Sequence, residues 1–257
     1  MLRPVTAQNL AAFEAACAHE RVFGSKCLSF YQAYRESGEA RFWVDLGPDG
    51  SANSALFLLG GVLVVSSNNR TDPAELAGLV RGCGVCEVDT NWDQCAALQK
   101  LLGGRAESSF YMEYPGGPIG GDYAGVTGAF RLPEVYAILR RSHEYYRAHL
   151  EYEPWARDLS LRLSLGLCEL YQLNVDGVPA GTGSIASEDG EVGVVAAVAV
   201  VPAFRGRGYG TLISRFLVDR ILQKGKRPVL ISGYDAVAEL YRRVGFRETG
   251  RWGELYL

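Results

Sequence analysis

The stretch VVPAFRGRGYGTLI, residues 200–213, places Gly206, Gly208 and Gly210 between an apolar run and a helix-like pattern. Glycine costs conformational entropy when it is ordered, so its repetition here indicates that the bare backbone must lie against something. The preceding residues, 192–201, are nearly all valine and alanine, which predicts a strand buried on both faces. The apolar spacing over residues 211–222 predicts an amphipathic helix.

A strand, a glycine-rich turn and a helix N-terminus together make an anion site, because several backbone N–H groups point outward without partners. Arg205 and Arg207 add positive charge at the rim. Two common nucleotide motifs fit poorly. A P-loop has lysine before Ser/Thr after its last glycine, but here Thr211 follows Gly210 directly. A dinucleotide fingerprint needs a further glycine or alanine where Thr211 stands, and an acidic residue on a following strand.

The pattern Arg205-Gly-Arg-Gly208-Tyr-Gly210 instead resembles (Arg/Gln)-x-x-Gly-x-(Gly/Ala), the pyrophosphate signature of the GNAT superfamily of acyl-CoA N-acyltransferases. A second stretch, ELYRRVGFRETG at residues 239–250, is similar to the family's C-terminal helix and the strand after it. The resemblance covers roughly residues 125–257. It implies an α/β (α+β) GNAT fold with a mixed, mostly antiparallel central sheet flanked by helices.

The resemblance implies acetyl-CoA as the cosubstrate and suggests where it lies. Its pantetheine arm would pair with a strand edge that splays from the next strand near Ile231, with the thioester in the gap. Tyr234 stands where many members carry asparagine, which leaves the usual polar contact in doubt. The residues expected to bind the cofactor are Val198, Ala199, Val200, Arg205, Gly206, Arg207, Gly208, Tyr209, Gly210, Thr211 and Tyr234.

The chemistry implied by the family is direct attack of an amine on the thioester. Tyr241 lies in the LY-x-x-x-GF stretch at the position of the general-acid tyrosine, although it could also be an ordinary packed residue. The general base is open, because residues 194–197 hold no carboxylate. Glu191 is one candidate and Glu169 a weaker one; both could equally be solvated charges, with a water chain in place of a dedicated base.

Three functions remain open. The first is an N-acetyltransferase, an acyltransferase enzyme that acts on a primary amine of a small molecule or peptide. The second is a non-catalytic acyl-CoA-binding or regulatory protein of the same fold. The third is an acyltransferase for a longer acyl chain. The acceptor itself cannot be identified from the fold, because acceptor contacts lie on variable loops.

The chain has a clear break at residues 115–121, where two prolines and four glycines punctuate the sequence. We therefore expect a domain over residues 1–120 and an acetyltransferase domain over residues 121–257. Both halves share an order of helices, a strand meander and alternating strands and helices, but the first lacks the glycine-arginine loop and resembles a degenerate GNAT-like domain. Residues 132–149 are expected to form a helix. The aromatic residues Trp43, Trp92, Trp155 and Tyr123 are expected to pack in cores, with lining of an acceptor pocket as the alternative.

The composition of the chain limits the partners and the location that we expect for it. The net charge of −3 argues against a nucleic-acid partner. The sequence has no apolar run long enough to span a membrane and no signal-peptide core, so we expect a cytoplasmic protein without a membrane partner, as a monomer or homodimer. Cys83 and Cys86 form a CxxC without a second ligand pair, so they are expected to be reduced structural thiols and no metal is expected.

Overall fold

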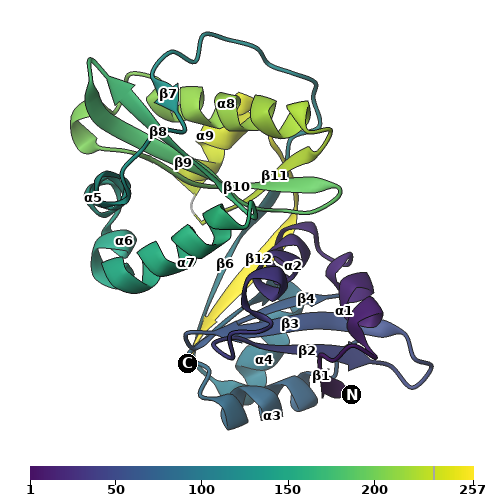
Figure 1. Ribbon diagram of the computed structural model, residues 1–257. Coiled ribbons are helices and arrows are strands. Elements are labelled where there is room, and N and C mark those ends of the chain that lie inside the picture. Colours follow the sequence, from purple (N-terminus) through teal and green to yellow (C-terminus); the bar gives the residue numbers. More distant parts are fainter. Residues whose placement is uncertain (234) are drawn as a thin grey trace. The chain divides into compact units, whose positions relative to one another are not determined.

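The computed structural model describes residues 1–233 and 235–257. The chain forms two compact units (Figure 1). The N-terminal unit comprises Met1–Tyr111 and Thr249–Leu257, and the C-terminal unit comprises Met112–Glu248. The first unit ends at Tyr111, whereas the sequence led us to expect a boundary after residue 120, and the end of the chain, Thr249–Leu257, returns to this unit.

The N-terminal unit is a sheet with helices before and between its strands. Its strands lie in the order β1-β2-β3-β4-β5-β12-β6, and the β4–β5 pair is parallel whereas the pairs β1–β2, β2–β3, β3–β4 and β5–β12 are antiparallel. The elements are β1 (Leu2–Pro4), α1 (Leu10–Cys17), α2 (Arg21–Tyr34), β2 (Arg41–Leu46), β3 (Ala52–Leu59), β4 (Val62–Ser67), α3 (Pro73–Cys83), β5 (Glu87–Asn91), α4 (Trp92–Leu102), β6 (Arg105–Glu113) and β12 (Arg247–Tyr256).

The last strand, β12, explains why the end of the chain belongs to this unit. Trp252 lies opposite Asn91 of β5 in an antiparallel ladder. Leu255 is fully buried and joins the core formed around β4, β5, α3 and α4. At Gly253 a Cβ would lie 2.5 Å from the Cβ of Cys95, so only glycine lets α4 approach the strand this closely.

The C-terminal unit repeats the same plan. Its strands lie in the order β11-β10-β9-β8-β7, and only the β10–β11 pair among these is parallel. The predicted mixed, mostly antiparallel sheet flanked by helices is thereby confirmed. The elements are β7 (Val126–Thr127), α5 (Leu132–Ser142), α6 (Glu144–His149), α7 (Tyr152–Ser164), β8 (Glu169–Val175), β9 (Val178–Glu188), β10 (Val192–Val200), the 3₁₀ turn η1 (Pro202–Phe204), α8 (Tyr209–Gln223), β11 (Arg227–Ser232) and α9 (Asp235–Val244).

Helices cover both faces of this sheet: α5 and α7 lie on one face and α8 on the other (Figure 1). The buried side of α5, with Val135 and Leu139, packs against Ala199 and Val201 at the end of β10. On the other face, a Cβ at Gly183 would lie 2.5 Å from Ile213 of α8. Small residues on the central strands therefore seat α8, whose N-terminus follows the glycine-rich loop.

The single helix expected over residues 132–149 is wrong, because the chain breaks at His143. This residue has extended backbone angles, φ −145° and ψ 141°. Its Nδ1 accepts the N–H of Tyr145 at 3.1 Å, which caps the new helix α6. A local side-chain cap thus competes successfully with continuation of the helix. It also leaves the last carbonyls of α5 open to other partners.

The glycine-rich connection at residues 115–121 is attached to the C-terminal unit by one buried carboxylate. Asp219 of α8 accepts the N–H of Ile119 at 2.7 Å and that of Gly120 at 2.9 Å, and also accepts the hydroxyl of Tyr123. The ring of Tyr123 packs against Phe216 at 5.5 Å. This tyrosine therefore has a structural role in the connection.

The predicted packing of the tryptophans is confirmed, since Trp43 is 8% exposed and Trp92 and Trp155 pack against buried clusters. All six cysteines are free thiols. Within the described residues, no helix has the length and apolar character that a membrane span requires.

Candidate functional site

The two parallel strands β10 and β11 separate at the loop end of the sheet. In the described part of the chain they pair from Val192 with Arg227 to Val194 with Val229. Strand β10 continues to Val200 and β11 to Ser232, so the facing edges of their last residues have no ladder between them. The pairing stops before Ile231, where the sequence led us to expect the strands to splay.

A bulge in β10 turns this open edge. The register with β9 shifts between Ala196 and Ala199, and Ala197 adopts φ +51°, which is uncommon for a residue with a side chain. Past the bulge, Val201 donates its N–H to Ala180 of β9 at 2.9 Å. Because successive backbone groups alternate in direction, the N–H of Val200 points to the opposite edge, toward the gap.

The glycine-rich loop closes that end of the gap with exposed backbone. Gly206 and Gly208 have φ +75° and +81°, and a Cβ at either would stand in open space. Gly208 is the N-cap of α8, and no side chain caps this helix. The N–H groups of the first turn, including Gly210 and Thr211, therefore lack intrahelical acceptors and are available to an anion.

The N-terminal unit differs at the corresponding position. Its β4–β5 ladder also stops early, at Val64 with Asp89. However, the helix that follows, α3, begins with Pro73, which has no N–H, and Asp72 accepts the N–H of Ala74 at 2.9 Å. This helix fills its own N-terminus with a carboxylate. In this unit, which lacks the glycine-arginine loop, a carboxylate of the chain itself therefore occupies the N-terminus of the helix.

The two loop arginines play different parts. The guanidinium of Arg205 donates to the carbonyl of Val200 at 3.1 Å and also to that of Ser142, the last residue of α5. It ties the loop to the ends of β10 and α5 rather than standing free at the rim. Arg207 is exposed and lies 5.7 Å from the ring centre of Phe204.

Tyr241 of α9 is 6% exposed and packs against Phe246 at 5.7 Å. Burial, together with the nearby phenol of Tyr146, raises the pKa of Tyr241, so it stays protonated at neutral pH. No hydrogen bond of its hydroxyl is found among residues 1–233 and 235–257. The proton is therefore present and uncommitted, which a donor to a leaving group requires.

The two candidate bases lie away from the gap. Glu191 precedes β10 at the end opposite the loop, about 30 Å from Val200 along the strand. Its side chain is 76% exposed and pairs with Arg227 at 3.0 Å. Glu169 lies on β8, with β9 between it and β10. Its geometry and that of Glu191 do not favour direct proton abstraction at the gap.

The electrostatics of Glu169 point the same way. Partial burial raises its pKa, but hydrogen bonds from Arg220, Lys224 and Tyr171 outweigh that effect and hold the pKa at about 2. Such a carboxylate is a poor proton acceptor near neutral pH. The last predicted contact, Tyr234, lies outside the described residues.

Sequence reasoning missed Ser232, the last residue of β11. It is 1% exposed, and its hydroxyl has no partner within the described residues. A buried, unpaired hydroxyl at the end of an open strand is a candidate ligand contact. No motif marks it, because its significance depends on where the ladder with β10 ends.

One acidic cluster, in the N-terminal unit, could hold a cation. Glu87, Asp89 and Glu254 bring carboxylate oxygens within 4.8 Å of one another. Lys26 already lies 3.3 Å from Asp89. Burial, reinforced by the neighbouring acids, raises the pKa of Glu87 to about 7. Lys26 thus already supplies a positive charge to this cluster.

Comparison with known proteins identifies the family of the C-terminal part. Residues 132–246 match the model of the acetyltransferase (GNAT) family. No curated protein matches the sequence.

Solved structures with a similar fold extend over the whole chain. A tandem GNAT protein from the clavulanic acid biosynthesis pathway is 13% identical with a TM-score of 0.64, covering 99% of this chain and 97% of its own. A GCN5-related N-acetyltransferase from Kribbella flavida is 19% identical with a TM-score of 0.64, covering 94% and 95%. One from Sphaerobacter thermophilus is 18% identical with a TM-score of 0.61, covering 99% and 94%. Residues 132–246 therefore form a domain of the GNAT acetyltransferase family, in a chain whose overall fold is that of GNAT proteins.

Proposed function

We propose that the C-terminal unit binds acetyl-CoA and transfers its acetyl group to a primary amine of a small molecule or peptide. The observation that carries this proposal is the uncapped N-terminus of α8 at the mouth of the gap between β10 and β11. The pyrophosphate would accept hydrogen bonds from the N–H groups of Gly206 to Thr211, whereas the N–H of Arg205 already donates to the carbonyl of Pro202 at 3.2 Å. The pantetheine arm would lie along the unpaired edge of β10, as an added strand does.

The reaction follows from this placement. A neutral amine attacks the thioester carbonyl, a C–N bond forms, the C–S bond breaks and the thiolate leaves. The N–H of Val200 faces the gap and would stabilise the oxyanion of the tetrahedral intermediate. Tyr241 would donate a hydrogen bond or its proton to the departing thiolate. Since neither Glu191 nor Glu169 is well placed, the ammonium form of the amine would lose one proton to water before attack. The nitrogen of the tetrahedral intermediate would lose the second proton to water as the thiolate leaves.

The alternative is a non-catalytic protein that binds acyl-CoA. The specific observation in its favour is the position of the two carboxylates, which leaves the gap without an evident base. The same test also applies to whether the acyl chain is acetyl or longer, because either chain would place its thioester at the same position.

A thermal-shift titration tests binding first, with acetyl-CoA beside ADP and NAD as controls. Saturation at 100 times the dissociation constant should stabilise the protein by about 2.7 kcal/mol. Release of free thiol from acetyl-CoA is then measured over a panel of amines. Binding together with amine-dependent release supports the enzyme; binding without release for any amine supports the alternative; no shift by millimolar acetyl-CoA contradicts both.

Tyr241→Phe separates the acid role from packing, because it removes only the hydroxyl. We expect the melting temperature to be unchanged and turnover to fall at least about tenfold, within the range usual for general acids. Unchanged turnover would show that Tyr241 is an ordinary packed tyrosine.

A further inference from the structure

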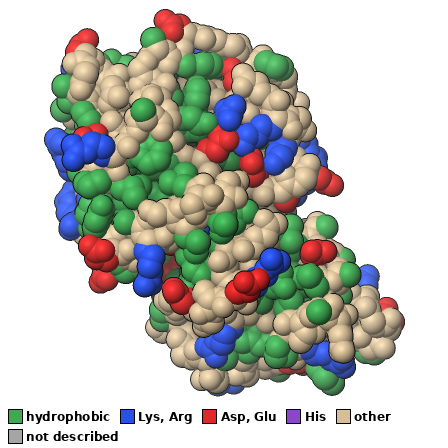
Figure 2. Space-filling model, viewed as in Figure 1, with side chains coloured by type: hydrophobic (Ala, Val, Ile, Leu, Met, Phe, Trp, Pro, Cys, Tyr) green, Lys and Arg blue, Asp and Glu red, His purple; other side chains and the backbone are tan. Residues whose placement is uncertain are grey.

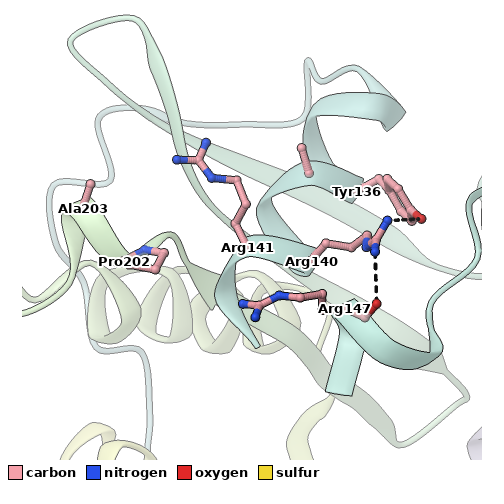
Figure 3. A pocket seen from close by; sticks show the side chains of 7 residues that line it. Tyr136, Arg140, Arg141, Arg147, Pro202 and Ala203 are labelled. Carbon is pink, nitrogen blue, oxygen red and sulfur yellow. Dashed lines mark hydrogen bonds between the residues drawn. The ribbon is translucent and has the colours of Figure 1, made fainter. Parts of the chain in front are cut away.

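Basic side chains gather over α5 on the face shown in Figure 2. At the same helix the C-terminal unit has a pocket of about 630 Å³, within the size range of small-molecule sites. Its walls come from α5, α6 and η1 (Figure 3). The lining residues are Tyr136, Ala137, Arg140, Arg141, Arg147, Pro202 and Ala203.

The three arginines of the pocket do not play the same part. Arg140 donates to the hydroxyl of Tyr136 at 3.4 Å and to the backbone carbonyl of Arg147 at 3.1 Å, so it braces the wall. The guanidinium groups of Arg141 and Arg147 extend toward the side where Pro202 lies (Figure 3). Both side chains are exposed, and neither has a carboxylate partner in the part of the chain that the structure describes.

This local charge is opposite to that of the chain as a whole, which carries −3. Within residues 140–147 and 202–207 there are five arginines, and the only acidic residue in those two segments is Glu144. Unneutralised guanidinium groups around a hollow are suited to phosphate, which they bind through charge-assisted and often bidentate hydrogen bonds.

The pocket lies against η1, the turn that leads into the glycine-rich loop. Pro202 and Ala203, in its wall, directly precede the loop in the chain. The guanidinium of Arg205 joins the end of β10 to Ser142 at the end of α5. A group held by Arg141 and Arg147 is therefore beside the N–H groups at which the pyrophosphate is proposed to bind.

We propose that this pocket binds a phosphate monoester and that Arg141 and Arg147 are its ligands. This inference rests on the proposed function. The source that the placement favours is the 3′-phosphate of the acetyl-CoA whose pyrophosphate occupies the loop. An anionic group on the acceptor is the other source, but the acceptor meets the thioester, which lies at the far end of the pantetheine arm.

The experiment compares acetyl-CoA with its 3′-dephospho form by titration calorimetry. It uses the wild type, Arg141→Gln, Arg147→Gln and the double variant, with Arg247→Gln as the matched control. Arg247 is an exposed arginine of the same unit outside the pocket. Glutamine at position 147 keeps the backbone carbonyl that accepts from Arg140, so the wall should be preserved, and thermal melts check this.

We expect the wild type to bind acetyl-CoA about tenfold or more tightly than the dephospho form. Each single variant should lose about three- to tenfold for acetyl-CoA and nothing for the dephospho form, as partly exposed charged hydrogen bonds do. In the double variant the preference should disappear. The Arg247→Gln protein should match the wild type with both ligands.

Equal binding of the two ligands by the wild type would overturn the 3′-phosphate assignment while leaving the proposed function intact. If the double variant instead raises the KM for the acceptor without changing the affinity for acetyl-CoA, the anion belongs to the acceptor. Failure of the wild type to bind either ligand would contradict the proposed function itself.

Discussion

Gly208→Ala tests the role of the loop through a small and calculable change. Gly208 has φ +81°, where a residue with a Cβ is strained, and the added methyl would meet nothing within 4 Å. The cost to folding is therefore backbone strain alone, about 1 kcal/mol. For a protein of this size that lowers the melting temperature by about 2–4 °C.

The same methyl would have a larger effect on the ligand. It would stand in the open space over the first turn of α8, where the pyrophosphate is proposed to contact bare backbone. Displacing even one charge-assisted hydrogen bond costs at least about 1.4 kcal/mol, which is tenfold in affinity. We therefore expect Gly208→Ala to bind acetyl-CoA at least about tenfold more weakly than the wild type.

Gly225→Ala is the matched control. Gly225 follows the other end of α8, has φ +72° and also faces open space, so the strain of an added Cβ is similar. Calorimetric titration and thermal melts of both variants should show the same loss of stability but weaker binding only for Gly208→Ala. Wild-type affinity in Gly208→Ala, or equal weakening in both variants, would refute the assignment of the pyrophosphate to this loop.

Three further predictions concern stability. Burial raises the pKa of Glu20 to about 7, although its hydrogen bonds act to lower it. The stability that Glu20 contributes is therefore full below about pH 4.5 and is lost as the pH rises through 7. Urea unfolding between pH 5 and 8 should show that Glu20→Gln removes about 3 kcal/mol of this decline in the free energy of unfolding. The depressed pKa of Glu169 acts oppositely, so Glu169→Gln should cost about 1 kcal/mol at pH 7, and this difference should vanish as pH falls from 4.5 toward 2. Asp219→Ala removes the acceptor of three hydrogen-bond donors, so it should lower the free energy of unfolding by about 2–4 kcal/mol and speed proteolysis at residues 115–121. Unchanged cleavage there would contradict the role of Asp219 in holding this connection.

The elements that were predictable from sequence are those whose cause is local. The valine-alanine run, the glycine spacing and the apolar stripe after it specify a strand, a loop and a helix within residues 192–222. The sequence did not reveal the break at His143, because the hydrogen bond that caps α6 joins residues only two positions apart and interrupts an otherwise periodic pattern. The return of β12 to the N-terminal unit was missed because its partner, β5, lies more than a hundred residues away in sequence.

The candidate site divides in the same way. The loop and Tyr241 carry recognisable motifs, so their positions could be predicted. Carboxylates are common along the chain, and sequence could not show that Glu191 pairs with Arg227 or that β9 separates Glu169 from β10. Ser232 could not be identified from sequence, because its significance depends on where the ladder between β10 and β11 ends. The pocket beside α5 could not be identified either, because its three segments, α5, α6 and η1, meet only in the fold.

The most direct test of the account is a crystal structure of the protein with acetyl-CoA. We predict pyrophosphate oxygens within hydrogen-bonding distance of the N–H groups from Gly206 to Thr211. The pantetheine arm should lie along the open edge of β10, with the thioester carbonyl near the N–H of Val200. Acetyl-CoA bound elsewhere on the molecule, with the gap between β10 and β11 empty, would contradict the central claim.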